Sequence, residues 1–190
     1  MKKFRLLVLI MAIAIIASEF SSVKAQAFKN GDFVGNLGLA FGWYGYGYGT
    51  TGFPAIGLSL EKGIKDLENI GPLSIGGIVE YKHSSYTWQS SYDWSWTDIV
   101  VAARSAIHYD LFKNEKIDTY GGVALGLRIQ SFTDYTFDGN NYVKGTASTT
   151  HGLFALYVGG RYYFSKKFAG FAEFGYGLGY ATIGLSYKFN

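Results

Sequence analysis

Cysteine is absent from this chain of 190 residues, and proline occurs only twice. Without cysteine the protein has no disulfide bonds, no thiol chemistry and no cysteine-based metal site. The two prolines, Pro54 and Pro72, lie where strands are predicted to begin, and such positions tolerate the missing backbone N–H. The fold therefore depends on backbone pairing and packing.

A cluster of basic residues is also missing. Four of the 17 basic residues and one of the 14 acidic residues lie within the first 25 positions, so 13 of each remain in the rest of the chain. Binding to nucleic acid needs a clustered basic surface that displaces counterions from phosphate groups. We therefore expect no nucleic-acid partner.

No apolar run is long enough for a transmembrane helix. The run at 6–17 is short, follows Lys2, Lys3 and Arg5, and leads into small residues up to Ala25. This order is typical of a secretory signal peptide. We predict a cleaved signal peptide over residues 1–25, Sec-type export and a mature domain over residues 26–190, with cleavage after Ala27 as the alternative. Such a domain can enter a membrane only as a closed barrel.

Glycine and aromatic residues are abundant, at 26 residues and 18% of the chain, and side chains alternate between apolar and small or polar. A period of two predicts β-strands. In the last segment, for example, Ile183 and Leu185 share one face, and Thr182 and Ser186 share the other. The predicted strands cover residues 31–43, 53–62, 72–82, 98–109 and 117–130, with three more within 152–189. The longest connections are predicted at 83–96 and at 131–150, the latter with a hairpin tip at 138–140.

The polar face of these strands decides which side is outside. It is dominated by Gly, Ala and Ser with a few charged residues, which suits the narrow interior of a small barrel. A register slip of one residue would turn Arg104, Arg128 and Arg161 toward lipid, at about 2–4 kcal/mol each near the midplane. We therefore predict an all-β fold, a transmembrane antiparallel up-and-down β-barrel of eight strands, with an apolar outer face and both termini in the periplasm.

Three segments of the last third carry a family resemblance: GRYYF at 160–164, FAEFGYG around Glu173, and GLSYKF at 184–189. They resemble the small eight-stranded outer-membrane β-barrel family of Gram-negative bacteria, the OmpA/OmpX-like outer membrane protein β-barrel domain. The last segment resembles that family's C-terminal assembly signal, with Gly184, Tyr187 and Phe189 in its positions, although Asn190 follows the final aromatic residue.

The resemblance implies where the protein resides and what it meets there. It predicts a porin-like, monomeric protein of the cell envelope in the outer membrane of a Gram-negative bacterium. Its partners would be outer-membrane lipid and lipopolysaccharide, with the barrel-assembly machinery and periplasmic chaperones acting during biogenesis, and an extracellular ligand.

The inward-facing charged residues form the first candidate site. The predicted ion-pair network of the lumen comprises Glu61, Glu80, Arg104, Arg128, Arg161 and Glu173. Because a buried charge without a partner is costly, we expect opposite charges on neighbouring strands to pair and to fill the lumen. The alternative is a gate, in which exchange of arginine partners opens a narrow conductance.

An extracellular aromatic loop is the second candidate site. It places aromatic residues at alternate positions: Tyr86, Trp88, Tyr92, Trp94 and Trp96. Cross-strand packing accounts for such a row, and the alternative is a stacking platform for a sugar or for a host or neighbouring surface. Because even positions oppose the outward parity of the strand at 98–109, the rings point inward unless a bulge lies near Thr97.

The motif His83-Ser84-Ser85 resembles the His-x-Ser of outer-membrane lipid A deacylases, with Asp93 or Asp98 to orient the histidine. No further part of that family's motif is present. The other histidines are isolated in sequence, so we expect no metal site and no cofactor.

We predict an integral outer-membrane protein with a structural or surface-interaction role, in adhesion or ligand binding, that is not an enzyme. The alternatives are a narrow channel for small or apolar solutes and a lipid A-modifying enzyme.

Overall fold

The computed structural model describes residues 27–42, 51–68, 70–88, 92–137, 142–176 and 179–190. The predicted signal peptide at 1–25 and the predicted hairpin tip at 138–140 lie outside the described residues. Within the described part of the chain, no helix has the length and apolarity needed to cross a membrane.

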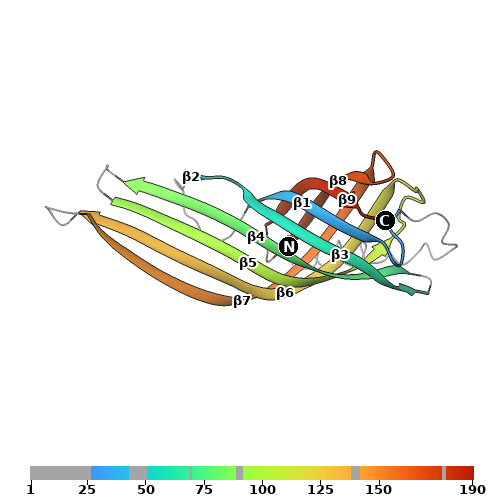
Figure 1. The fold of residues 1–190 in the computed structure, drawn as a ribbon, viewed down its shortest axis with the longest axis horizontal. Coiled ribbons are helices and arrows are strands. Elements are labelled where there is room, and N and C mark those ends of the chain that lie inside the picture. Colours follow the sequence, from blue (N-terminus) through green and yellow to red (C-terminus); the bar gives the residue numbers. More distant parts are fainter. Residues whose placement is uncertain (1–26, 43–50, 69, 89–91, 138–141, 177–178) are drawn as a thin grey trace, which may run out of the picture.

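The described elements are all strands, arranged in one closed sheet (Figure 1). Their bounds are β1 Phe33–Phe41, β2 Thr51–Gly52, β3 Ala55–Leu67, β4 Gly71–Trp88, β5 Tyr92–Tyr109, β6 Ile117–Phe137, β7 Tyr142–Tyr163, β8 Phe168–Tyr176 and β9 Ala181–Lys188. The ring runs β4-β3-β1-β9-β8-β7-β6-β5 and closes through β4–β5, with every pair antiparallel. The short β2 adds to the edge of β4. The predicted eight-stranded up-and-down barrel is confirmed.

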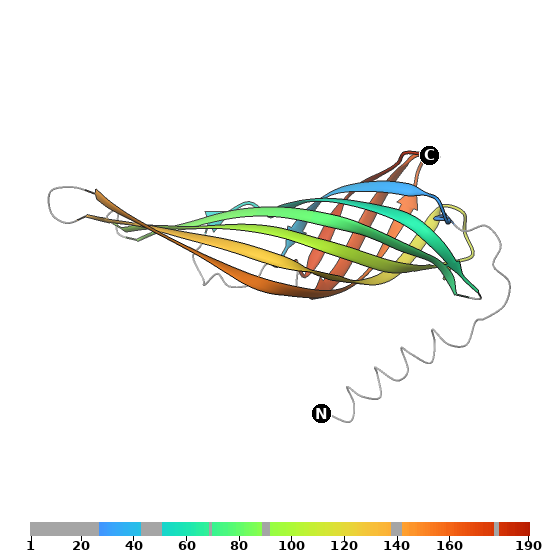
Figure 2. The ribbon, with the colours of Figure 1, turned by 60° about the horizontal axis from the view of Figure 1, so that its bottom comes forward.

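The strands differ greatly in length. β4 to β7 have 18 to 22 residues each, whereas β1, β8 and β9 have eight or nine. The four long strands therefore continue past one end of the ring as a curved sheet, which Figures 1 and 2 show extending away from β8 and β9. We call this extension of β4–β7 the projecting sheet. It lies at the end that carries the four connections, opposite the end with the three turns at 68–70, 110–116 and 164–167.

The prediction of long connections at 83–96 and 131–150 is largely wrong. The β4–β5 pairing continues to Trp88 and Tyr92, and the β6–β7 pairing continues to Phe137 and Tyr142. These stretches are rich in Thr, Tyr, Trp and Phe, which favour strands even where apolar alternation has stopped. The strands therefore extend beyond the residues whose apolar alternation predicted them.

Register divides the side chains as predicted. Leu125 and Leu185 on the outer face are each 60% exposed, whereas Val34 and Arg161 on the inner face are at most 1% exposed. The outer face of the ring is thus an apolar belt. A Cβ atom at Gly184, on the inner face, would collide with the carbonyl oxygen of Leu37, so glycine lets β9 approach β1 closely and complete the ring.

The two ends of the described chain meet at the end of the barrel that carries the three short turns. The ring of Phe28 is fully buried and stacks on His108 with centroids 3.8 Å apart. At the other terminus, the Asn190 side chain accepts a hydrogen bond from the Phe33 N–H at 2.8 Å and donates one to the Gly31 carbonyl at 2.9 Å. Phe28 thus closes the lumen at this end, and Asn190 fastens the last strand to the first.

Candidate functional site

The lumen holds two layers of charged side chains, of which the first surrounds Arg161 on β7. Its guanidinium donates to Glu61 on β3 and to Asp118 on β6, the latter at 2.8 Å, and lies 4.5 Å from the centroid of the Tyr120 ring. Asp118 also contacts Nδ1 of His108 at 2.8 Å. Every member is buried, and apart from Glu61 Oε2 and Arg161 Nε, which have no hydrogen-bond partner among the described residues, the layer is a compact plug of paired groups.

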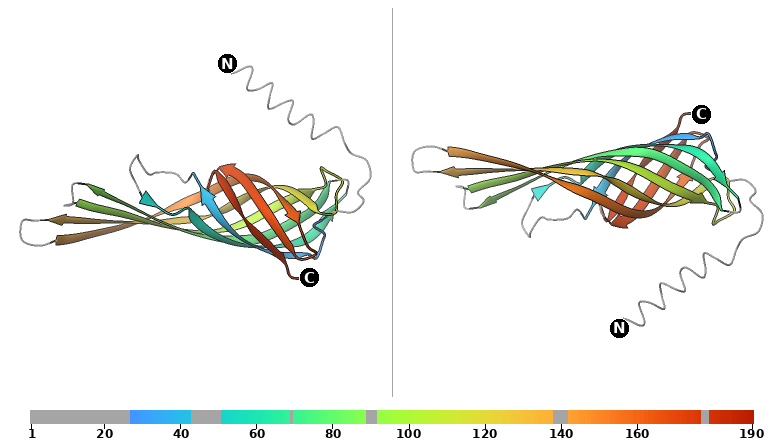
Figure 3. Two further views of the ribbon diagram at one scale, coloured as in Figure 1. Left: turned by 90° about the horizontal axis from the view of Figure 1, so that it is seen from above. Right: turned by 90° about the horizontal axis from the view of Figure 1, so that it is seen from below.

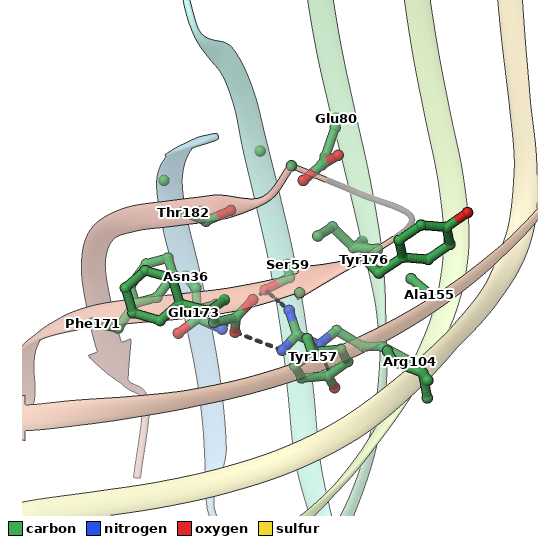
Figure 4. Close-up of a pocket in the computed structure, with 17 residues that line it drawn as sticks. Asn36, Ser59, Glu80, Arg104, Ala155, Tyr157, Phe171, Glu173, Tyr176 and Thr182 are labelled. Carbon is green, nitrogen blue, oxygen red and sulfur yellow. Dashed lines mark hydrogen bonds and ion pairs between the residues drawn. The ribbon is translucent and has the colours of Figure 1, made fainter. Parts of the chain in front are cut away.

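The second layer surrounds Arg104 on β5, nearer the projecting sheet. Its Nη2 donates to Glu173 Oε1 at 2.7 Å, its Nε to the Tyr157 hydroxyl at 3.1 Å, and its Nη1 to Ser59 Oγ at 3.3 Å. Figure 4 shows Arg104 reaching Glu173 and Ser59 across the interior. The Tyr120 hydroxyl donates to the same Glu173 oxygen at 2.9 Å and so links the two layers.

All six residues of the predicted lumen network lie on the inner face, but the partners differ from the expectation. Arg128 pairs with Asp98 at 2.8 Å and not with a glutamate. Glu80 is 1% exposed, forms no ion pair among the described residues, and its Oε2 has no hydrogen-bond partner there. In Figure 4 it lies apart from the Arg104 group. Sequence reasoning left Asp98 and Asp118 out of the network because each stands at the end of a predicted strand.

The interior leaves little free space. The cavity beside Arg104, Glu80 and Glu173 measures about 20 Å³, which is on the scale of one water molecule. Between this cavity and Phe28, the buried side chains of the two layers occupy the lumen, and Phe28 covers the end. An eight-stranded barrel has an interior just wide enough for side chains, and here they occupy it.

Above the barrel, the chemistry of the outer face changes abruptly. The apolar belt on β4, β5 and β6 ends at the cross-strand row Tyr81–Ile99–Ile129. The next outward row reads His83, Thr97, Ser131 and Ser148, joined by hydrogen bonds from His83 Nδ1 to Thr97 Oγ1 at 3.0 Å and between the Ser131 and Ser148 hydroxyls at 2.7 Å. The row beyond it contains Ser85, Ser95, Thr133 and Thr146. The projecting sheet therefore has a hydroxyl-rich outer face.

Its inner face is aromatic. The β4–β5 register has no bulge, so Tyr86, Trp94 and Trp96 point to the side of the lumen and not outward. Tyr86 and Trp94 stack with centroids 5.7 Å apart, and Trp96 lies 5.5 Å from Phe132. Sequence reasoning missed Phe132. Trp88 and Tyr92 pair at the tip of the hairpin, and their side chains lie outside the described ones.

One edge of the projecting sheet is open. β7 pairs with β8 only over Leu156–Tyr163, so in the described chain its segment 142–155 has a partner strand, β6, on one side alone. From 144 to 152 its side chains are small or polar, and most are exposed, as Lys144, Thr146 and Thr149 are. The sheet is thus open at this edge as well as at its inner face (Figure 3).

The described residues considered for hydrolysis do not form a triad. His83 and Ser85, the base and the nucleophile of the His-x-Ser motif, both point outward on β4, whereas Ser84 between them is buried on the inner face. Of the two proposed orienting carboxylates, Asp98 lies on the inner face and pairs with Arg128, and the side chain of Asp93 lies outside the described ones. His108 belongs to the Arg161 layer, and His151 lies on the inner face of β7.

The residues of the predicted assembly signal lie on β9 and just after it. The ring of Tyr187 lies 4.9 Å from Phe168 and 5.1 Å from Phe189, whose ring is in turn 5.0 Å from Phe33. This aromatic cluster rims the barrel at the end that carries Phe28. Such a girdle is typical of the boundary of a membrane barrel, and recognition of these residues by an assembly machinery stays a prediction.

No protein-family model and no curated protein sequence matches the chain. Among solved structures, it resembles Ail, the attachment invasion locus protein of Yersinia pestis, with a TM-score of 0.53, 16% identity, and coverage of 84% of this chain and 99% of Ail. It is also similar to the N-terminal β-barrel domain of OprF from Pseudomonas aeruginosa, with a TM-score of 0.40, 16% identity, and coverage of 85% and 98%. The closed ring of strands and the likeness to Ail show that the chain has the fold of the small eight-stranded outer-membrane β-barrels.

Proposed function

We propose that this chain is an outer-membrane protein whose projecting sheet binds a partner outside the cell. The apolar belt supports insertion into the membrane of a Gram-negative bacterium, and the signal-like residues 1–25 support Sec-type export with a mature domain at 26–190. Lipid and lipopolysaccharide would surround the belt of a monomer, after insertion by the barrel-assembly machinery. No catalytic step is part of this proposal.

The observation that carries the proposal is the change from apolar to hydroxyl-bearing side chains on the outer face at the row Tyr81–Ile99–Ile129. Below this row the outer face is apolar, and above it the outer face carries hydroxyl groups while the inner face carries aromatic rings. An apolar surface suits lipid and a hydroxyl-rich surface suits water. The projecting sheet therefore stands in the aqueous phase, with an open inner face and the open edge of β7 available for contact.

A fold by itself does not fix a function, so the role rests on the projecting sheet. Ail, which shares the fold, is an attachment protein by its name, and a binding role here agrees with that. The channel alternative is disfavoured because described side chains fill the lumen in two layers. The lipid A-modifying alternative is disfavoured because Asp98, a proposed orienting carboxylate, lies on the opposite face of the sheet from His83 and Ser85 and pairs with Arg128.

The test compares the full chain with a trimmed variant on the surface of a laboratory bacterium. In the variant, residues 85–95 and 132–147 are each replaced by a two-residue Asn-Gly turn, which suits a short hairpin. Attachment is counted on surfaces coated with mucin, laminin or fibronectin, at equal amounts of folded barrel in the outer-membrane fraction. We expect the full chain to support attachment to at least one coating and the trimmed chain to lose it. Equal attachment would contradict the binding role, and absence of the full chain from that fraction would contradict the location.

A further inference from the structure

The inner face of the projecting sheet carries four aromatic residues in two adjacent cross-strand rows. Tyr86 pairs with Trp94 in one row, and Trp96 pairs with Phe132 in the next. The first pair is nearly parallel, at 6° between ring planes, and the second is tilted at 41°. All four side chains are partly exposed. We call these four residues the aromatic platform.

Cross-strand packing alone does not account for the position of the platform. Aromatic pairs stabilise a sheet on whichever face they occupy, yet in the projecting sheet the described outward rows beyond the belt are mostly Ser and Thr. Across the barrel, β1, β8 and β9 end near the level where the projecting sheet begins, so no described strand faces the platform (Figure 3). Large rings thus stand on a concave face that no strand of the described chain covers from the far side.

Polar side chains border the platform on the side of the lumen. The next inward row contains Asp98, Gln130 and Thr149, and Asp98 Oδ1 accepts hydrogen bonds from Gln130 Nε2 at 3.1 Å and from Arg128 Nε at 2.8 Å. Thr149 is exposed, and Gln130 is partly exposed. Flat apolar rings beside a few hydrogen-bonding groups are the usual composition of a small-ligand site.

The charges on this face do not gather into a cluster of one sign. Its described charged residues are two bases, Lys82 and Arg128, and three acids, Asp98, Asp134 and Glu80, which stands in the same cross-strand row as Arg128. A polyanion such as a sulfated glycan would need a cluster of bases, and a polycation would need a cluster of acids. This mixture of signs therefore favours a neutral ligand that both donates and accepts hydrogen bonds and presents a flat apolar surface. A pyranose ring has these properties, because its C–H groups can lie on an aromatic face while its hydroxyls bond to polar side chains.

The direction of the face identifies where the ligand comes from. The inner face of the projecting sheet turns toward the barrel axis (Figure 2). In the proposed function, lipid and lipopolysaccharide surround the outer face of the barrel instead. An extended peptide would pair along the open edge of β7, since backbone groups are available at an edge and not on a face. We propose that the aromatic platform binds neutral pyranose sugars of a glycan that approaches from outside the cell. This inference rests on the proposed function, of which it names the ligand.

The test uses the full chain in lipid nanodiscs and titrates it with cellohexaose, maltohexaose, galactohexaose and a heparin hexasaccharide. Binding is followed by tryptophan fluorescence and calorimetry. We expect at least one neutral hexasaccharide to bind and the heparin fragment not to bind. Trp96→Ala should weaken binding about 10–30-fold, as is usual when a central aromatic contact is removed. Trp96→Phe should retain most of the affinity.

A matched control lies on the opposite face of the same strand. Thr97→Ala, next to Trp96 but pointing outward, should leave the affinity unchanged. The inference is overturned if no neutral hexasaccharide binds, if the heparin fragment binds instead, or if Trp96→Ala and Thr97→Ala weaken binding equally. If trimming abolishes attachment while no sugar binds, the proposed function stands and the sugar inference falls. If trimming has no effect on attachment, the proposed function itself falls.

Discussion

At the scale of single residues, the buried arginines hold the interior together. Arg161 lies between Glu61 and Asp118 and over the ring of Tyr120, which brings β3, β6 and β7 to one point. Burying three ionised groups is costly unless each is well paired. Within this layer the pairing is direct, so removal of Arg161 leaves the buried carboxylate of Glu61 without a described ion-pair partner and leaves Asp118 with His108 alone.

We predict that Arg161→Met destabilises the barrel by about 3–5 kcal/mol, the usual cost of breaking a buried ion pair from one side. The free energy of unfolding is measured by urea titration in lipid vesicles. The control is Arg128→Met, which also removes one arginine from an ion pair, but from a side chain that is 19% exposed and reaches water. Its loss should be smaller. Equal losses would show that the Arg161 layer does not have the predicted role, and adding Glu61→Gln with Asp118→Asn to Arg161→Met should recover part of the stability.

The direction of the inward charges was predictable, but their partners were not. Alternation assigns Arg104, Arg128 and Arg161 to the inner face, because the other parity would place them in lipid. Partners depend on the stagger of strands around the ring, which alternation does not define. Thus Arg104 reaches Glu173, three strands away around the ring, and Glu80 lies in the interior without a described ion pair.

At the scale of elements, each of the long strands β4–β7 passes from lipid into water along its length. Their outer face is apolar up to Tyr81, Ile99 and Ile129 and hydroxyl-rich beyond them. The strands themselves continue without interruption, because backbone pairing does not depend on what surrounds the sheet. The boundary between lipid and water is therefore a change of side chains within an element.

We predict that arginine is tolerated on one side of this boundary and not on the other. Leu125→Arg, in the middle of the apolar belt, should cost about 2–4 kcal/mol, whereas Thr133→Arg, on the same strand and face but beyond the boundary, should cost about 0–1 kcal/mol. Urea unfolding in lipid vesicles measures both values. Similar costs at the two positions would place the boundary elsewhere on β6.

The ring was predictable from sequence, and the projecting sheet was not. Within the ring, Ile56, Leu58 and Leu60 alternate with small residues, so period two is visible. In the projecting sheet, residues with hydroxyl groups alternate with aromatic or charged residues, as in Ser131, Phe132, Thr133 and Asp134. This pattern also occurs in polar loops. Only the pairing partners distinguish a strand of this composition from a polar loop, and a single sequence does not show which strands pair.

At the scale of the whole molecule, the described residues close the lumen at the end with the three short turns and leave it open at the end with the projecting sheet. Phe28 and the Arg161 layer block one end, and the Arg104 layer blocks the middle. Toward the projecting sheet, the inner face opens and carries the aromatic platform. These blocked levels agree with the proposed binding role and not with the channel alternative.

We predict that the full chain does not conduct in a planar lipid bilayer. Phe28→Ala should not conduct either, because removing the stacked ring leaves the paired layers of Arg161 and Arg104 in place. A variant that removes both arginines, Arg104→Gly with Arg161→Gly, should show conductance steps, provided that its heat-modified mobility on a gel confirms a folded barrel. Reproducible steps from the unaltered chain would contradict the closed lumen and revive the channel. Steps from Phe28→Ala alone would mean that the ring, rather than the charged layers, is the barrier.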